Sequence, residues 1–293
     1  MIKYSNGNTT VTILEDGTKI REWDGDAELY FPESIDVKIS DYCDLGCSWC
    51  HESSTTSGKH GDLDKLFQVL FELPAGIELA IGGGNPLSHP NLTPFLYKLK
   101  EKGFIVNLTV NQGHLKPFFS MLEFLIKEDL VKGIGISITS NNFKYVEMLK
   151  GLTDHVVYHV IAGVNKVEII DTLMNVGNPC KVLVLGYKKF GFGVQYHNTE
   201  IDNEIRRWYM SLPKYIGKCL LSFDNLAIEQ LNIKRLFTSQ GWDRFFMGED
   251  FSHSMYIDAV KQQYAPTSRS SERKSFKDYT LLKYFNNYKR NDI

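Results

Sequence analysis

Short apolar segments that read as strands alternate along this chain with longer amphipathic segments that read as helices. The predicted strands cover residues 35–40, 77–81, 104–110, 133–139, 155–162, 181–186 and 219–223, and the predicted helices cover 62–73, 91–102, 115–127, 142–150, 166–175 and 201–211. Strands that alternate with helices favour parallel βαβ units. About six or seven such units predict an α/β fold built on a partial or full (β/α) barrel rather than on a flat doubly wound sheet.

The predicted strands have two unlike faces. In the first strand the apolar positions are Ile35, Val37 and Ile39, and the polar positions are Asp36, Lys38 and Ser40. Strands that are buried on both faces are almost continuously apolar. We therefore expect one face to pack under helices and the small or polar face to line space for a ligand inside the barrel. A sheet with one solvent-exposed face is the alternative.

Two regions lie outside this repeat. The segment TTVTILEDGTKIREW alternates around Asp16-Gly17, a pair typical of a type I′ turn, and predicts a β-hairpin within residues 1–30. Residues 31–225 would then be the barrel core, and residues 226–293 a C-terminal cap or extension. From Ser268 to Arg290, seven Lys or Arg accompany two acids. This pattern predicts a solvated tail or cap, or else a flap that meets an anionic substrate.

Bulk composition narrows the class of protein. The formal net charge of −2 over 293 residues gives no global field that favours nucleic acid or membrane partners. No apolar run reaches the roughly 18 residues of a spanning helix, and MIKYSNGNTT lacks the apolar core of a signal peptide. We therefore expect a cytoplasmic protein, where disulfides are rare. Five cysteines cannot all be paired, so the clustered ones are expected to bind metal or to be redox-active.

Three of the five cysteines follow the first predicted strand in YCDLGCSWC. Cys43, Cys47 and Cys50 have the spacing C-x-x-x-C-x-x-C. Three thiolates can hold three irons of a [4Fe–4S] cluster and leave the fourth iron open for chemistry. Gly46 allows the loop to fold back around such a cluster, and Trp49 is placed to cover a ligand on the open iron.

Two other uses of these cysteines stay open. A non-catalytic, zinc-stabilised binding protein would need a fourth ligand, for which His51 is the nearest candidate. His51 is adjacent to Cys50, however, and is poorly placed to close a tetrahedron. A Cys47–Cys50 redox pair would leave Cys43 without a role.

The cysteine stretch resembles the signature of radical S-adenosylmethionine (SAM) enzymes, which carry C-x-x-x-C-x-aromatic-C after the first strand of a (β/α) barrel. Cys43, Cys47, Trp49 and Cys50 match it position by position. A second match follows the second predicted strand. Gly83, Gly84, Asn85 and Pro86 resemble the family's G-G-E-P-like loop, which binds the amino group of SAM through backbone carbonyls. Gly82, which precedes them, is a further candidate for binding the cofactor. Asparagine replaces the acid of that loop, and a backbone contact tolerates this change.

The resemblance covers about residues 30–225 and implies further contacts with SAM at the strand ends. It implies that Thr109 and Asn111 meet the carboxylate and ribose, that Ser137 contributes from the fourth strand, and that Val160 or Ile161 packs on the adenine. The implied cofactors are one [4Fe–4S] cluster and SAM. The implied reaction is reductive cleavage of SAM to a 5′-deoxyadenosyl radical, which abstracts hydrogen from a small-molecule or peptide substrate. The implied electron donor is an external, flavodoxin- or ferredoxin-like protein.

The substrate side is less constrained. The polar residues expected near the mouth are Gln112, Tyr187, Lys188 and Asp224, and Asp224 would serve equally well as a helix N-cap. Cys180 and Cys219 are spare thiols, too few for a second cluster, and each would be either a hydrogen donor or a small buried residue. Cys180, Cys219 and Asp224 are therefore the catalytic candidates. Modification of a nucleotide or nucleic-acid base, with residues 268–290 meeting phosphate, is an alternative function.

Overall fold

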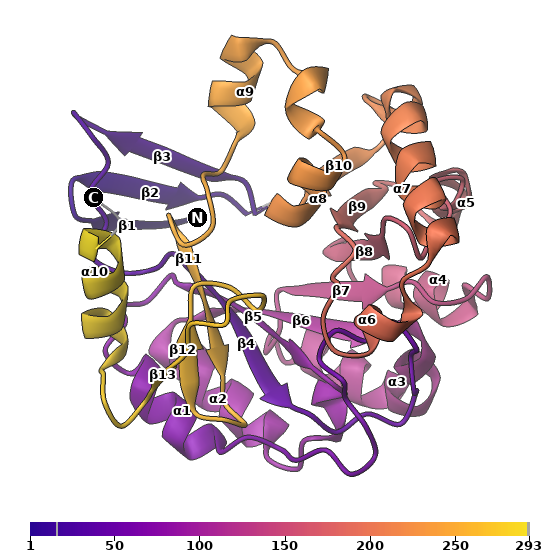
Figure 1. The fold of residues 1–293 in the computed structure, drawn as a ribbon. Coiled ribbons are helices and arrows are strands. Elements are labelled where there is room, and N and C mark those ends of the chain that lie inside the picture. The colour runs from indigo at the N-terminus through magenta and orange to yellow at the C-terminus, as the bar shows by residue number, and fades with distance from the viewer. Residues whose placement is uncertain (16, 292–293) are drawn as a thin grey trace.

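The computed structural model of the chain describes residues 1–15 and 17–291. Its centre is a ten-stranded sheet in the order β10-β9-β8-β7-β6-β5-β4-β11-β12-β13 (Figure 1). Seven neighbouring strands run parallel: β4 (Ser34–Ser40), β5 (Glu78–Gly83), β6 (Ile105–Asn111), β7 (Gly133–Ser137), β8 (Val156–Ile161), β9 (Lys181–Leu185) and β10 (Leu220–Phe223). Within the described chain β10 and β4 do not pair, so the barrel is partial. The predicted α/β barrel is confirmed.

Helices connect the parallel strands. They are α1 (Leu63–Leu70), α2 (Leu92–Lys102), α3 (Gln112–Lys127), α4 (Lys144–Lys150), α5 (Ile169–Val176), α6 (Phe192–Tyr196), α7 (Thr199–Ser211) and α8 (Asn225–Gln230), with short 3₁₀ turns η1 (Pro86–Ser88), η2 (Leu212–Tyr215) and η3 (Ile233–Leu236). Asp62 begins α1 by accepting a hydrogen bond from Lys65 N, and Asn198 begins α7 in the same way. In the part of the chain that the structure describes, no helix has the length and apolarity needed to cross a bilayer.

The two faces of the barrel strands are arranged as the sequence predicts, one in the core and one toward the cavity. Apolar positions such as Ile35, Leu79 and Ile134 are fully buried in the main hydrophobic core. The alternate positions, including Asp36, Gly82, Thr109 and Ser137, line an interior cavity of about 1360 Å³. The barrel therefore encloses space for a ligand, and its ligand-facing surface is the polar face that the alternation indicates.

An N-terminal antiparallel sheet packs at one end of the barrel. It consists of β1 (Ile2–Asn6), β2 (Thr9–Ile13) and β3 (Lys19–Trp23), so the predicted hairpin is present and gains one strand. The turn residue Asp16 lies outside the described residues. Ile13 packs with Ile105 at the start of β6, and Lys19 Nζ lies 2.6 Å from Glu78 Oε2 at the start of β5. This sheet therefore sits where the barrel strands begin (Figure 1).

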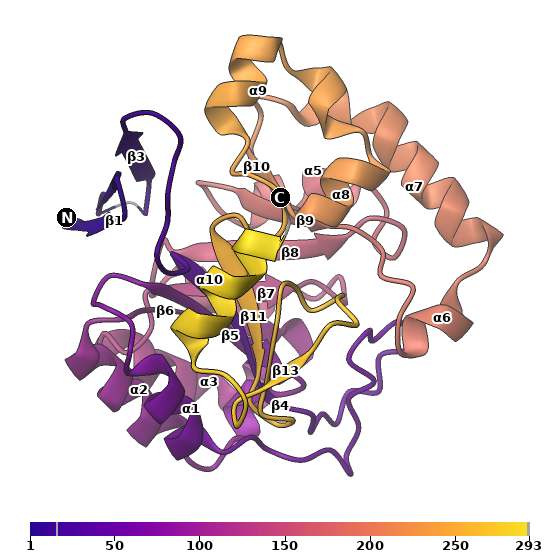
Figure 2. The same ribbon diagram turned by 60° about the vertical axis from the view of Figure 1, so that its left-hand side comes forward.

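The C-terminal segment is built into the main sheet, so the interpretation of a solvated tail is wrong. It contains α9 (Ser239–Phe245), β11 (Ser254–Asp258), β12 (Gln263–Ala265), β13 (Lys274–Ser275) and α10 (Leu281–Asn291). β11 pairs in parallel with β4 (Figure 2). The rings of Tyr264 and Tyr284 stack 5.3 Å apart. Pairing covers the edge of β4 that would otherwise be open. The division into three domains stays a prediction.

Candidate active site

The cysteine loop leaves the carboxyl end of β4 and borders the cavity with all three thiols. Cys43, Cys47 and Cys50 are free, partly buried and among the cavity-lining residues. Backbone hydrogen bonds shape the loop: Cys50 N donates to Cys47 O at 3.1 Å, and Cys43 N donates to Thr55 O at 2.9 Å. Gly46 has φ of +61°, the left-handed conformation that glycine adopts readily, as the sequence predicts.

Burial raises the pKa of Cys43 and of Cys47, and the neighbouring thiols raise both further. Three thiolates in such close proximity repel one another when nothing neutralises them. A bound cation stabilises thiolates and removes this penalty. The three thiols, which border one cavity, are therefore suited to act together as ligands of a positively charged centre.

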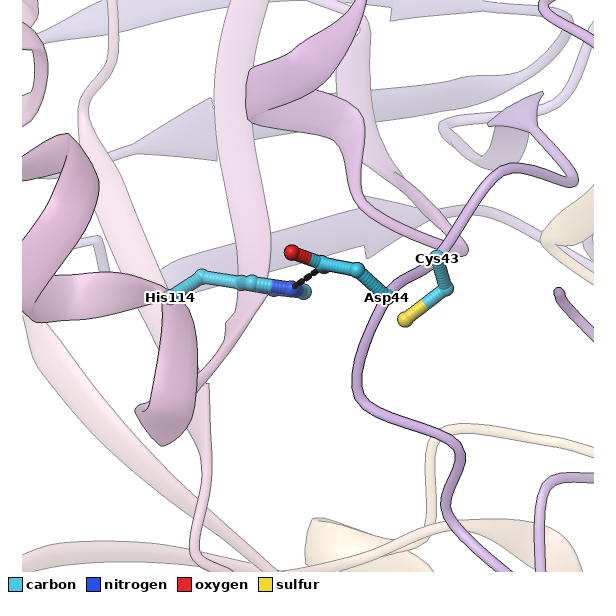
Figure 3. Close-up of side chains that lie close together, drawn as sticks. All are labelled: Cys43, Asp44 and His114. Atoms are coloured by element: carbon cyan, nitrogen blue, oxygen red, sulfur yellow. Dashed lines mark hydrogen bonds and ion pairs between the residues drawn. The ribbon is translucent and has the colours of Figure 1, made fainter. Parts of the chain in front are cut away.

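A second contact fixes the loop from α3. His114 is fully buried, and its Nε2 lies 2.8 Å from Asp44 Oδ1, on the residue after Cys43 (Figure 3). Cys43, Asp44 and His114 place their polar atoms within 4.8 Å of one another. Because imidazole and carboxylate already bond to each other, we interpret the trio as a tether between the loop and α3. The tether hydrogen bond lowers the pKa of Asp44.

Asn111 joins the end of β6 to the cysteine loop. Its Oδ1 accepts a hydrogen bond from Gly113 N at 2.9 Å, which caps α3. The same oxygen accepts a hydrogen bond from Thr139 Oγ1 at 3.0 Å. Its Nδ2 donates to Cys47 Sγ at 3.8 Å. Asn111, a predicted cofactor residue, thus lines the cavity, and its hydrogen bonds orient the Cys47 sulfur and the first turn of α3.

The glycine loop packs against the base of the cysteine loop. Gly84 N donates to Ser40 O at 2.7 Å, and Asn85 N donates to Tyr42 O at 2.6 Å. A Cβ atom on Gly84 would lie 2.2 Å from Tyr42 O, whereas one on Gly82 would meet only Thr109 Cβ at 3.5 Å. Close packing therefore requires glycine at position 84, while Gly82 borders open cavity.

The other predicted cofactor residues divide into two groups. The residues that line the cavity are Trp49, Gly82, Gly83, Gly84, Thr109, Asn111, Ser137 and Ile161. Val160 is fully buried in the core on the opposite face of β8, which leaves Ile161 as the cavity-facing member of that pair. Asn85 is buried, and its Oδ1 caps η1 by accepting from Leu87 N at 3.1 Å. Its side chain is not among those lining the cavity.

The structure separates the catalytic candidates. Cys180 and Cys219 lie just before β9 and β10, at the beginnings of these strands. Burial raises the pKa of Cys180 to about 12, and neither thiol is among the cavity-lining groups. Asp224 reaches the cavity but caps α8, since its Oδ1 accepts from Ala227 N at 2.7 Å. The N-cap interpretation of Asp224 is confirmed.

The polar residues expected at the mouth have mixed roles. Gln112 is buried and accepts hydrogen bonds from Thr139 N and Ser140 N at 3.0 and 2.9 Å, so it braces the end of β7. Tyr187 lines the cavity with its hydroxyl bonded to Gly193 O at 2.7 Å. Lys188 lines the cavity and donates to Ser268 Oγ at 3.2 Å. Lys188 is therefore the best placed of these for a ligand.

Two further residues face the cavity and were not singled out by motif. Asp36 on β4 projects inward, where burial raises its pKa and the nearby Lys188 opposes that rise. His159 on β8 lies over Gly135, whose missing side chain leaves room for the imidazole, and burial lowers the pKa of His159 to about 4. The strand alternation that places Ile161 inward also places His159 inward, so the sequence carried this signal.

Comparison with known proteins decides the family. The model of the Radical SAM superfamily matches residues 37–190, which include the cysteine loop, the glycine loop and strands β5 to β9. The chain belongs to the radical SAM superfamily. Membership of this superfamily implies an enzyme whose cofactors are a [4Fe–4S] cluster and SAM.

Solved structures share the fold of this radical SAM enzyme. SuiB of Streptococcus suis bound to the precursor peptide SuiA matches with a TM-score of 0.63 and 14% identity, covering 88% of this chain and 65% of SuiB. SuiB bound to SAM matches with a TM-score of 0.60 and 14% identity, covering 87% and 65%. The chain thus spans less than two thirds of SuiB. A search of curated proteins finds no significant match.

The residues of this radical SAM enzyme fit a three-cysteine cluster. Three thiols share one cavity wall, and Asn111 offers an N–H to one of the sulfurs. In the zinc alternative His51 is the fourth ligand, and its Nε2 already lies 3.3 Å from Lys188 Nζ and 3.4 Å from Glu52 Oε1. The cluster would therefore be held by Cys43, Cys47 and Cys50.

Proposed function

We propose that this chain is a single-cluster radical SAM enzyme that abstracts hydrogen from a substrate held inside its partial barrel. When bound, the cluster and SAM would supply the chemistry, in which one electron from an external flavodoxin- or ferredoxin-like donor would cleave SAM to methionine and a 5′-deoxyadenosyl radical. One observation carries this proposal: the three thiols and the glycine loop border the same interior cavity. That arrangement supports a reaction confined between cluster and barrel.

The residues that line the cavity are placed to bind and orient SAM and the substrate and to shield them. Gly82 and Gly83 leave backbone groups accessible at the cavity wall, and the hydroxyls of Thr109 and Ser137 face the same space. Ile161 offers an apolar surface for a flat ring. Trp49 lines the cavity and packs beside Tyr196 at a ring separation of 5.6 Å.

The size of the cavity supports a separate substrate. Ordinary small-molecule sites occupy about 300–1,000 Å³, and this cavity of about 1360 Å³ exceeds that range. Three polar groups line its walls: the carboxyl group of Asp36, the uncharged imidazole of His159 and the side-chain amine of Lys188. We infer a polar substrate that carries charged groups.

The substrate is either a small molecule or a peptide segment, and two observations support the peptide. A second cavity of about 510 Å³ shares Asp36, Lys188 and Asp224 with the first and is lined by residues of β10 and β11, so the barrel also opens between these two strands. An extended chain entering there can place one residue inside the barrel. SuiB, which has the same fold, has been crystallised with its precursor peptide.

The nucleic-acid alternative gains no support. Arg269 is paired with Asp250, and Arg273 donates to the carbonyls of Ser270 and Ser268 at 3.0 and 2.9 Å. These basic groups of the C-terminal segment therefore serve its own folding. We also propose a cytoplasmic location, which the five free thiols support, since thiols persist in a reducing compartment.

Anaerobic reconstitution with iron and sulfide tests the function. With SAM and dithionite, the protein is expected to produce 5′-deoxyadenosine, measured by mass spectrometry, and Cys47→Ala is expected to produce none. Cys219→Ala is the matched control, because Cys219 lies outside the cavity, and it should retain the activity of the unmodified protein. Zinc in place of iron and sulfide, or cleavage that survives in Cys47→Ala, would refute the proposal.

A further inference from the structure

Both ends of the cysteine loop meet at one buried ammonium group. Lys38 on β4 is 4% exposed, and its Nζ lies 2.8 Å from Asp41 Oδ1 and 3.0 Å from Glu52 Oε2. Asp41 precedes the first cysteine by two residues, and Glu52 follows the last by two. The 12-residue segment from Asp41 to Glu52, which contains all three cysteines, is therefore closed at its base by Lys38.

The C-terminal strand completes this contact. Asp258, at the end of β11, is 2% exposed and places its Oδ2 2.8 Å from Lys38 Nζ. Tyr256, on the same strand, donates its hydroxyl to Glu52 Oε1 at 3.3 Å. A segment more than 200 residues from the cysteines in sequence thus contacts both the lysine and one end of the cysteine loop.

Two further contacts connect Lys38 and Glu52 to residues at the cavity, one through the glycine loop and one through His51. The stem of Lys38 packs on the glycine loop, since a Cβ on Gly83 would lie 2.9 Å from Lys38 Cγ. On the other side, Glu52 contacts His51, and His51 contacts Lys188 at the cavity wall. Lys38 therefore touches the scaffold of the cysteine loop, the glycine loop and the C-terminal strand at once.

Stability alone is a poor explanation for this group. Burying an ammonium with carboxylates costs desolvation energy that often equals the Coulombic gain, and apolar residues of similar volume frequently stabilise a fold as well. The best-attested use of a buried ion pair is to fix one arrangement among several. Free loops of this length have many arrangements, and bringing their ends together costs conformational entropy.

We propose that Lys38 is a positioning residue that clasps the two ends of the cysteine loop, with Asp258 of the C-terminal strand as its anchor. The clasp holds Cys43, Cys47 and Cys50 in one orientation before a cluster binds. It makes the C-terminal segment a working part of the active site.

Hydrogen exchange of the whole 293-residue chain without its cluster tests the clasp directly. In Lys38→Met, amides of residues 43–50 are expected to exchange about tenfold faster, while those of β6 and α3 keep their rates. Asp41→Asn and Glu52→Gln release one end each and are expected to give smaller increases in the same segment. Lys98→Met, which breaks an exposed 2.6 Å ion pair between α2 and Asp64 of α1, is the matched control and should leave the segment unchanged.

Cluster retention gives a second reading on reconstituted protein. Lys38→Met, Asp41→Asn and Glu52→Gln are expected to lose iron to EDTA about tenfold faster than the unmodified protein. Asp258→Asn is expected to lose iron at a rate between those of these variants and the unmodified protein. Should Lys38→Met fail to fold, the Asp41→Asn/Glu52→Gln double variant takes its place. Exchange that rises equally across the whole sheet, or that stays unchanged in residues 43–50, would overturn the proposal, whether or not SAM is cleaved.

Discussion

Asn111 allows the helix cap and the sulfur contact to be separated by substitution. Asn111→Ala removes the capping oxygen of α3, the acceptor for Thr139 and the N–H donor to Cys47 Sγ. Asn111→Asp keeps the capping oxygen and removes only the donor. Asn198→Ala removes the N-cap of α7, because Asn198 Oδ1 accepts a hydrogen bond from Ile201 N at 3.1 Å. Asn198 does not line the cavity.

The expected magnitudes follow from these contacts. Losing an N-cap costs about 1 kcal/mol, and losing the hydrogen bond with Thr139 costs about 1 kcal/mol more. We therefore expect urea unfolding of the protein without its cluster to show a loss of about 2 kcal/mol in Asn111→Ala and about 1 kcal/mol in Asn198→Ala. Asn111→Asp should unfold close to the unmodified protein.

The cluster potential gives the decisive measurement. Hydrogen bonds to cluster sulfurs raise the reduction potential, because they stabilise the more negative reduced state. A contribution of about 1 kcal/mol corresponds to about 40 mV for one electron. An anaerobic potentiometric titration followed by electron paramagnetic resonance should therefore place Asn111→Ala about 40 mV lower and Asn111→Asp lower still, with Asn198→Ala unchanged. Equal potentials in Asn111→Asp and the unmodified protein would refute the assigned sulfur contact.

Two further predictions concern the glycine loop and the barrel histidine. Gly84→Ala forces a Cβ to 2.2 Å from Tyr42 O, so anaerobic calorimetry should show lost SAM binding and unfolding should show a loss of about 2 kcal/mol, whereas Gly82→Ala should fold normally. The folded pKa of His159, about 4, lies below its ordinary value of 6.5, so between these pH values the unfolded chain binds a proton that the folded chain does not. Stability is therefore present above pH 6.5 and falls toward pH 4 by up to about 3 kcal/mol. His159→Gln should flatten this fall in urea unfolding, and an unchanged pH profile would contradict the assignment.

Much of the fold and part of the site could be predicted because they depend on local patterns. Residue type and spacing alone mark the cysteine loop, since ligands on one short loop stay together in any fold that contains it. The alternation of β4 and β6 predicts which side chains enter the barrel, because successive residues of a strand point to opposite faces. The same rule assigns Ile161 rather than Val160 to the cavity once the phase of β8 is known.

Long-range pairing decided the rest. The sequence places the segment around Tyr256 in a C-terminal cap or extension, and its parallel pairing with β4 makes it a strand of the main sheet. Lys38 reads as one polar position among several, yet it meets Asp41, Glu52 and Asp258 at a single point. Local sequence determined the chemistry of the cysteine loop, because that chemistry needs only neighbouring residues. The tertiary structure decided what holds the loop in place, because a buried ammonium takes whichever carboxylates the folded chain brings to it.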